Sequence, residues 1–340
     1  MSDFSKEDKI MAFSLLGDFL RKPNAAFNQV IHSAQNYNAW FTPAEVSKAV
    51  AALGNMLNHT DLQNWLATYP ENSKVNTIGL VLAGNLPLVG LHDVLCVLST
   101  GNKAVIKPSS QDNQLLIAVL NQLFYIEPRF KAMVKIVLKL DNFDAIIATG
   151  SNNTSRYFEY YFGRVPHIIR KARNAVAVLT GNETCHELQL LGEDIFSYYG
   201  LGCRNVSKLF VPKGYDFNFF FESIESYNPI INHHKYHNNY DYNKSIYLVN
   251  KTPHLDNGFL LLSPNEALCS PLAVLYHQSY NNLADIEKQI MANQNSLQVI
   301  VSHANLNTPV AAVNFGESQK PKINDYADGV NTLQFLASLG

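Results

Sequence analysis

Short apolar runs alternate with amphipathic segments between residues 75 and 162, and this alternation restricts the fold more than any other feature of the chain. The apolar runs predict strands, and the segments between them predict helices because their apolar residues recur every three or four positions. We expect strands over residues 77–84, 104–107, 135–140 and 145–149, and helices over 87–98, 112–124 and 154–162. Continuously apolar strands that alternate with helices form a parallel sheet covered on both faces. The sequence therefore predicts an α/β fold.

A second set of strands and helices follows the first. We expect strands over residues 167–170, 175–179, 208–212, 245–249, 259–262, 272–276 and 298–301, and helices over 187–199 and 283–292. Between them, residues 227–244 are polar and rich in Asn, His and Tyr, which predicts a loop. These elements predict a second α/β lobe.

The length of 340 residues allows two domains, since single domains usually run about 100 to 200 residues. Residues 6–20 and 43–57 have the apolar spacing of helices. We therefore expect a helical N-terminal segment over residues 1–70 and a first lobe over 71–184 with part of 304–340. The second lobe is expected over 185–303.

Composition and charge narrow the class of function. The formal net charge of −2 gives no basic excess for a nucleic acid, and no apolar run approaches the length of a membrane span. The four cysteines are scattered without a CxxC pair, which predicts free thiols, and the three histidines of residues 233–237 lack nearby acidic or cysteine partners for a metal. With no signal peptide at the N-terminus, these features favour a cytoplasmic protein with a small-molecule substrate and no metal.

Cys203 is the candidate nucleophile. It follows a glycine-rich turn, Tyr198-Tyr-Gly-Leu-Gly-Cys203, where small residues leave a thiol accessible. The thiolate is the reactive form, so such a cysteine acts only where its surroundings lower its pKa. The alternative is a buried cysteine that serves as a small hydrophobic side chain.

Three further motifs follow predicted strands. Asn85 precedes a helix that we expect to begin at Pro87, and its amide suits an oxyanion or a turn. Lys107 ends a strand, where it either donates to ribose or phosphate or is a solvated charge. Gly150 and Ser151 lead from a strand into a helix, which allows backbone N–H groups to approach a pyrophosphate but also suits a tight turn.

Taken in order, these motifs resemble those of the aldehyde dehydrogenase superfamily. That superfamily has Asn before Phe/Leu-Pro, then Gly-Asn-x-Val-x-Lys-Pro-Ser, Thr-Gly-Ser and Gly-Gln-x-Cys. The matching stretches here are Asn85-Leu-Pro87, Gly101-Asn to Lys107-Pro-Ser109, Thr149-Gly-Ser151 and Gly200-Leu-Gly-Cys203. More narrowly, the chain resembles the LuxC-like acyl-CoA reductases over roughly residues 70–340. That resemblance is carried by residues 198–207, 267–273, 315–319 and 325–330.

The resemblance implies a fold and a set of roles. The fold would be aldehyde dehydrogenase-like, with a cofactor-binding and a catalytic Rossmann-like lobe. Cys203 would attack the carbonyl, while Asn85 and the backbone N–H of Cys203 hold the oxyanion. Lys107 would hold the adenosine ribose, and Gly150 with Ser151 would approach the pyrophosphate.

Two departures from the superfamily pattern refine the expected chemistry. Ile169 stands where hydrolytic members carry the glutamate that activates water, and an apolar side chain cannot act as a general base. Ser110 stands where members that prefer NAD often carry a glutamate, so no carboxylate there repels a 2′-phosphate. We therefore expect acyl-CoA rather than free-acid chemistry, and NADPH as cofactor with NADH as the alternative.

The resulting hypothesis is a reductase that converts an acyl-CoA, of the fatty class, to its aldehyde through a thioacyl group on Cys203. Within the enzyme class, the alternative is a reductase of acyl phosphates. Outside it, the alternative is a subunit that binds acyl groups without catalysis. A homo-oligomer and an acyl-transfer partner both stay open, and we expect neither a nucleic-acid partner nor membrane insertion.

Overall fold

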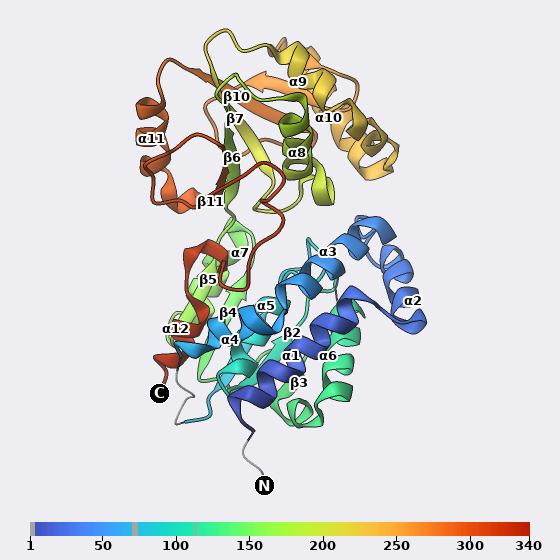
Figure 1. The fold of residues 1–340 in the computed structure, drawn as a ribbon, viewed down its shortest axis with the longest axis vertical. Coiled ribbons are helices and arrows are strands. Elements are labelled where there is room, and N and C mark those ends of the chain that lie inside the picture. Colours follow the sequence, from blue (N-terminus) through green and yellow to red (C-terminus); the bar gives the residue numbers. More distant parts are fainter. Residues whose placement is uncertain (1–3, 70–73, 113) are drawn as a thin grey trace. The chain divides into compact units, whose positions relative to one another are not determined.

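The computed structural model describes residues 4–69, 74–112 and 114–340, which form two compact units (Figure 1). Unit 1 consists of Met1–Ala172 and Pro321–Gly340, and unit 2 consists of Arg173–Lys320. The expected boundary between lobes lay at residue 184. Strand β6 (Asn174–Val178) nevertheless pairs with strands of the second sheet, so the chain passes from one unit to the other before it.

Unit 1 contains a five-stranded parallel sheet with the order β3-β2-β1-β4-β5. Its strands are β1 (Thr77–Val81), β2 (Lys103–Lys107), β3 (Val134–Ile136), β4 (Ala145–Thr149) and β5 (His167–Arg170). Its helices are α1 (Lys6–Arg21), α2 (Ala25–Ser33), α3 (Pro43–Met56), α4 (His59–Ala67), α5 (Leu91–Ser99), α6 (Gln114–Ile126), α7 (Asn152–Phe162) and α12 (Thr332–Ala337). Short 3₁₀ turns are η1 (Ala34–Asn36), η2 (Pro128–Met133) and η6 (Ala327–Gly329). The predicted parallel α/β architecture is confirmed.

The N-terminal helices share one hydrophobic core with the sheet. On α1, Phe13 and Leu16 are buried at helical spacing, and they belong to the same apolar cluster as Leu80 of β1. Helices α1 and α3 approach closely at Gly17, where an added Cβ would lie 2.6 Å from the carbonyl oxygen of Leu57. The tail returns to this core through Leu333 of α12. Unit 1 is thus built from both ends of the described chain.

Unit 2 contains a seven-stranded sheet with the order β12-β11-β6-β7-β10-β9-β8, in which only β8 is antiparallel to its neighbour within the described residues. Its other strands are β7 (Val206–Pro212), β8 (Leu255–Asp256), β9 (Leu261–Pro264), β10 (Val274–Tyr280), β11 (Leu297–Val301) and β12 (Ala312–Val313). Its helices are α8 (Cys185–Phe196), α9 (Phe217–Ser223), α10 (His234–Asn250) and α11 (Leu283–Ala292), with 3₁₀ turns η3 (Ser197–Gly200), η4 (Glu225–Asn232) and η5 (Gln294–Ser296). One apolar cluster of unit 2 includes buried residues of α8, and a separate cluster includes buried residues of α11.

The loop expected over residues 227–244 and the strand expected over 245–249 are both wrong, because this region forms η4 and α10. Tyr236, Tyr240 and Tyr247 recur at helical spacing and are buried along one side of α10. The apolar run that suggested a strand is the end of the same helix, where Val249 is 81% exposed. The buried face of this helix consists mainly of tyrosines, so the polar composition of the segment concealed its helical periodicity.

In the ranges that the structure describes, no helix is long and apolar enough to cross a membrane. The same ranges contain no group of three or more His, Cys, Asp or Glu side chains that could hold a metal ion. His233 instead accepts a hydrogen bond from the backbone N–H of Tyr236 and caps α10.

Candidate active site

Three neighbouring strands of unit 1 end at the same edge of the sheet. The strands β2, β1 and β4 are adjacent and parallel, so their carboxyl ends lie side by side. The chain runs from β1 outwards to β3 and then restarts at β4 on the other side of β1. Ligands of open α/β sheets bind outside such a reversal of strand order. The candidate site residues lie at these three strand ends. Strand β2 ends at Lys107 and is followed by Ser110, β1 is followed by Asn85, and β4 is followed by Gly150 and Ser151. The structure therefore brings the five residues to one edge of the sheet.

Asn85 lies in a loop that is longer than predicted. Helix α5 begins at Leu91 rather than at Pro87, because Leu88 adopts a left-handed backbone conformation (φ 58°) that no regular helix continues. A side chain from beyond β2 fixes this loop, since the N–H of Leu88 donates to Oδ2 of Asp112 at 2.5 Å. The Asn85 side chain is exposed.

Asp112 was not predicted as a site residue. Burial is the main cause that raises its pKa to about 6, and the hydrogen bond from Leu88 opposes the rise. Among the residues that the structure describes, none forms a hydrogen bond with its second oxygen, Oδ1, which is buried. Because the contact joins residues 24 positions apart, sequence spacing offered no signal for it.

Lys107 and Ser110 both have exposed side chains at the end of β2. The carbonyl oxygen of Lys107 accepts a hydrogen bond from the N–H of Leu82, which fixes the strand end while the ammonium group extends into solvent. Both side chains are therefore accessible to a ligand.

Gly150 allows α7 to pack closely on the end of β4. A Cβ atom at this position would lie 2.9 Å from Cε2 of Phe158 and 3.0 Å from Cβ of Thr154. Ser151 is the N-cap of α7, and its Oγ accepts a hydrogen bond from the N–H of Thr154. The N-terminus of α7 thus lies at the same sheet edge as Lys107. Such a terminus suits an anion, and these residues fit a dinucleotide.

Ile169 lies on β5, paired with Ala148 of β4. The next residue, Arg170, forms a buried ion pair with Asp93 of α5 and donates to Oγ1 of Thr332 at 2.9 Å. This pairing ties β5 to the C-terminal helix α12.

Cys203 belongs to unit 2, where it lies between the end of α8 and the start of β7. Its side chain is exposed, so the alternative of a buried apolar cysteine does not hold. Three consecutive residues before it adopt left-handed conformations: Tyr198 (φ 53°), Tyr199 (φ 59°) and Gly200 (φ 79°). Residues with a Cβ adopt this conformation only where their surroundings enforce it, and such residues cluster at functional sites. The ring of Tyr199 packs on that of His233 with 4.2 Å between centroids.

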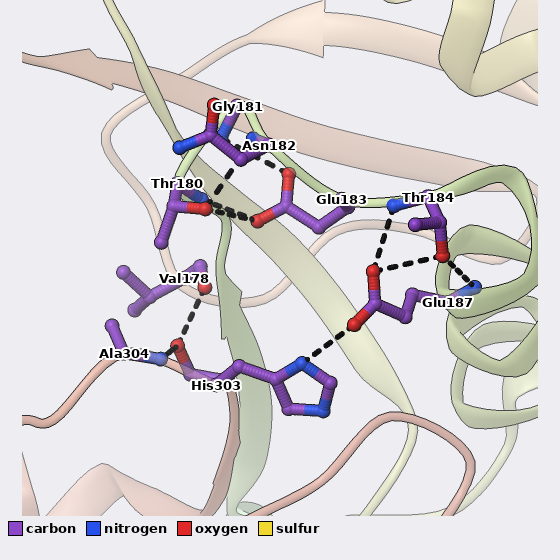
Figure 2. A network of polar contacts seen from close by, with 10 residues as sticks. Val178, Thr180, Gly181, Asn182, Glu183, Thr184, Glu187, His303 and Ala304 are labelled. Carbon is purple, nitrogen blue, oxygen red and sulfur yellow. Dashed lines mark hydrogen bonds and ion pairs between the residues drawn. The ribbon is translucent and has the colours of Figure 1, made fainter.

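The opposite end of α8 is held by a network of polar contacts beyond β6, shown in Figure 2. Thr184 and Glu187 form a capping box, with the N–H of Thr184 donating to Oε2 of Glu187 at 2.7 Å. Nδ1 of His303, in the segment after β11, lies 2.9 Å from Oε1 of Glu187. These contacts lower the pKa of Glu187, chiefly through its hydrogen bonds with Thr184. The helix that leads to Cys203 is therefore anchored at its start.

A sequence model of one protein family covers the motifs that precede residue 213. The model, described as acyl-CoA reductase (LuxC), matches residues 18–213, a range that includes Asn85, Lys107, Gly150 and Cys203. The chain belongs to the LuxC acyl-CoA reductase family. It is accordingly an oxidoreductase that acts on acyl or aldehyde groups, and the predicted family is confirmed.

Solved structures of aldehyde dehydrogenases share the fold of this LuxC-family chain. An oxidoreductase from Marinobacter aquaeolei matches with a TM-score of 0.72 and 12% identity, over 97% of this chain and 82% of that one. Aldehyde dehydrogenase 21 from Physcomitrella patens, in complex with the reaction product succinate, matches with a TM-score of 0.71 and 13% identity, over 99% and 85%. An NADP-dependent enzyme from E. coli matches with a TM-score of 0.67 and 12% identity, over 92% of this chain and 79% of that one. No curated protein matches the chain.

Proposed function

We propose that this chain reduces a fatty acyl-CoA to its aldehyde, with Cys203 as the nucleophile and NADPH as the reductant. The observation that carries the proposal is the exposed thiol of Cys203 on a strained turn, in a chain of the LuxC acyl-CoA reductase family. Strain of this kind persists in folded proteins where a functional geometry requires it.

The first step is transfer of the acyl group to the enzyme. The thiolate of Cys203 attacks the thioester carbonyl, and the C–S bond to CoA breaks as the new C–S bond forms. Negative charge develops on the carbonyl oxygen, and the backbone N–H of Cys203 and the side-chain amide of Asn85 are its proposed donors. Preorganised donors of this kind lower the activation free energy by about 3 kcal/mol each.

The carboxyl edge of unit 1 is the proposed cofactor site. Lys107 would hold the ribose, and the N-terminus of α7 with Gly150 and Ser151 would hold the pyrophosphate. Ser110 places no carboxylate near the ribose, which favours the 2′-phosphate of NADPH over NADH. When bound, the nicotinamide supplies the hydride that brings the thioacyl carbon to the aldehyde level. Cys203 then leaves the resulting hemithioacetal as a thiolate, and the aldehyde is released.

Ile169 supports reduction over hydrolysis. Deacylation by water needs a general base that removes a proton from the attacking water. The aliphatic side chain of Ile169 has no group that accepts a proton, so the thioacyl group on Cys203 persists until it is reduced or returned to CoA.

Intact-mass measurement with an acyl-CoA and no cofactor tests the central step. The wild-type chain should gain the mass of one acyl group, and Cys203→Ala should gain none. Cys269→Ala is the matched control, since Cys269 is another exposed cysteine of unit 2 and its loss should leave acylation intact. Acylation that survives in Cys203→Ala would disprove the proposed nucleophile. A series of acyl chain lengths in the same assay identifies the preferred substrate.

A further inference from the structure

Asn205 makes an unusually complete set of hydrogen bonds two residues after Cys203. Asn205 is 4% exposed, and the two hydrogens of Nδ2 are shared among the carbonyl oxygens of Asp194 (3.2 Å), Ile195 (3.3 Å) and Ser197 (2.9 Å) at the end of α8. Its Oδ1 accepts from the N–H of Gly202 at 2.8 Å. One side chain thus joins the last turn of the helix to the residue before the nucleophile.

The backbone of Asn205 holds the next peptide group as well. Its N–H donates to the carbonyl oxygen of Gly202 at 3.0 Å. That carbonyl and the N–H of Cys203 belong to the same peptide, which is planar and trans, so the two bonds point in opposite directions. With the carbonyl turned towards Asn205, the N–H of Cys203 is turned away from it. The direction of the proposed oxyanion donor is therefore set by the backbone N–H of residue 205, whose position the Asn205 side chain holds through its bonds to Gly202 and to the end of α8.

We infer that Asn205 is the positioning residue of the nucleophile turn: it holds the thiol and the backbone N–H of Cys203 in the geometry that acyl transfer requires. The inference rests on the proposed function. The left-handed residues Tyr198 and Tyr199 make such a brace necessary, because an L-residue with a side chain leaves this conformation unless its neighbours hold it. Asn205 holds both sides of the strained segment, at Ser197 before it and at Gly202 after it.

The two halves of the amide have separable roles. Nδ2 caps the carbonyl groups of α8, and Oδ1 orients Gly202. Asn205→Ala removes both. Asn205→Asp keeps an acceptor for Gly202, and in its ionised form it has no donor for α8 and adds a negative charge near Cys203, which raises the pKa of the thiol. Asn257→Ala is the matched control, since Oδ1 of Asn257 also accepts from two backbone N–H groups of unit 2, those of Phe259 and Leu260.

Two rates measured on the full chain distinguish positioning from simple stabilisation. The first is single-turnover acylation by an acyl-CoA, which needs an oxyanion donor. The second is alkylation of Cys203 by iodoacetamide across pH, followed on the Cys203 peptide by mass spectrometry, which needs only the thiolate. Asn205→Ala should slow acylation by about 100-fold, the usual loss for a displaced reacting group or oxyanion donor, and slow alkylation by less than about threefold. Asn205→Asp should move the alkylation midpoint to higher pH, and the control should match the wild type in both rates.

The outcomes that overturn the inference are specific. Acylation of Asn205→Ala within about twofold of wild type, or equal losses in acylation and alkylation, would show that Asn205 only stabilises the fold. Absence of acylation in the wild type would overturn the proposed function together with this inference, whereas wild-type acylation that persists unchanged in Asn205→Ala overturns this inference alone. If Asn205→Ala does not fold, Asn205→Asp tests the inference in its place. An alkylation midpoint at the wild-type pH, together with acylation at the wild-type rate, would then overturn the inference.

Discussion

Replacing Gly150 by alanine tests how closely α7 must pack on β4 for the cofactor edge of unit 1 to form. The added Cβ would lie 3.0 Å from Cβ of Thr154, which is fixed to the helix backbone, whereas ordinary contact begins at 3.4 Å, so helix and strand must separate by about 0.4 Å. Overpacking of this kind costs about 1 to 3 kcal/mol, and we expect a loss of about 2 kcal/mol in the free energy of unfolding. The same displacement moves Ser151 and the N-terminus of α7.

Among the kinetic properties, only the binding of NADPH should change. Interaction of an anion with a helix N-terminus contributes up to about 1 kcal/mol, so KM for NADPH should rise by about fivefold when the terminus moves. Acylation of Cys203 by acyl-CoA without cofactor should keep its wild-type rate. Urea unfolding, steady-state NADPH oxidation and intact-mass acylation measure the three quantities.

Gly79→Ala is the matched control for this prediction. Gly79 lies within β1, away from the strand end, and its added Cβ would lie 3.2 Å from Cγ of Phe143. It should lose stability without a change in KM. An unchanged KM and unchanged stability in Gly150→Ala, or an equal rise in KM in Gly79→Ala, would refute the argument that close packing of α7 builds the pyrophosphate site.

Two further predictions concern cofactor choice and pH. Ser110→Glu should lower kcat/KM for NADPH by about tenfold or more relative to NADH, because a carboxylate repels the 2′-phosphate, and an unchanged ratio in steady-state assays would contradict this placement of the ribose. Burial raises the pKa of Asp112 to about 6 from 3.8, so the folded chain binds this proton more tightly than the unfolded chain does. Its contribution to stability is therefore full below pH 4 and falls as pH rises towards 6, by roughly 3 kcal/mol. Urea unfolding at pH 4 and pH 7 should show this loss in the wild type and not in Asp112→Asn. An equal change in the free energy of unfolding between the two pH values in both proteins would contradict the prediction.

Much of the fold could be predicted because local patterns agree with tertiary structure in the parallel sheets. The strands β1, β2 and β4 are apolar at their centres, and a glycine or proline follows each of them near the carboxyl edge. The edge residues Asn85, Lys107 and Gly150 could be found for the same reason. Helix α10 could not, because its buried face is made of tyrosines in a segment of polar composition.

The contacts around the candidate site are harder to predict than the residues at the edge of the sheet. Helix α5 starts four residues late because Asp112 holds Leu88 from beyond another strand, and hydrophobic periodicity contains no information on that contact. Asn205 likewise reads as an ordinary polar residue between a turn and a strand. Only the tertiary structure shows that its side chain bonds both to the end of α8 and to the residue before Cys203.

The return of residues 321–340 to unit 1 sets an order of events during synthesis. Leu333 and Leu336 of α12 complete the core of the first unit, and Thr332 accepts the hydrogen bond from buried Arg170. All of Arg173–Lys320 emerges from the ribosome before these residues do, which takes on the order of ten to thirty seconds at ordinary translation rates. During that interval the surface of α5 that α12 later covers is open to water, and the Arg170–Asp93 pair lacks the cover of α12. Chaperones therefore meet an incomplete core in the unit whose sequence is translated first.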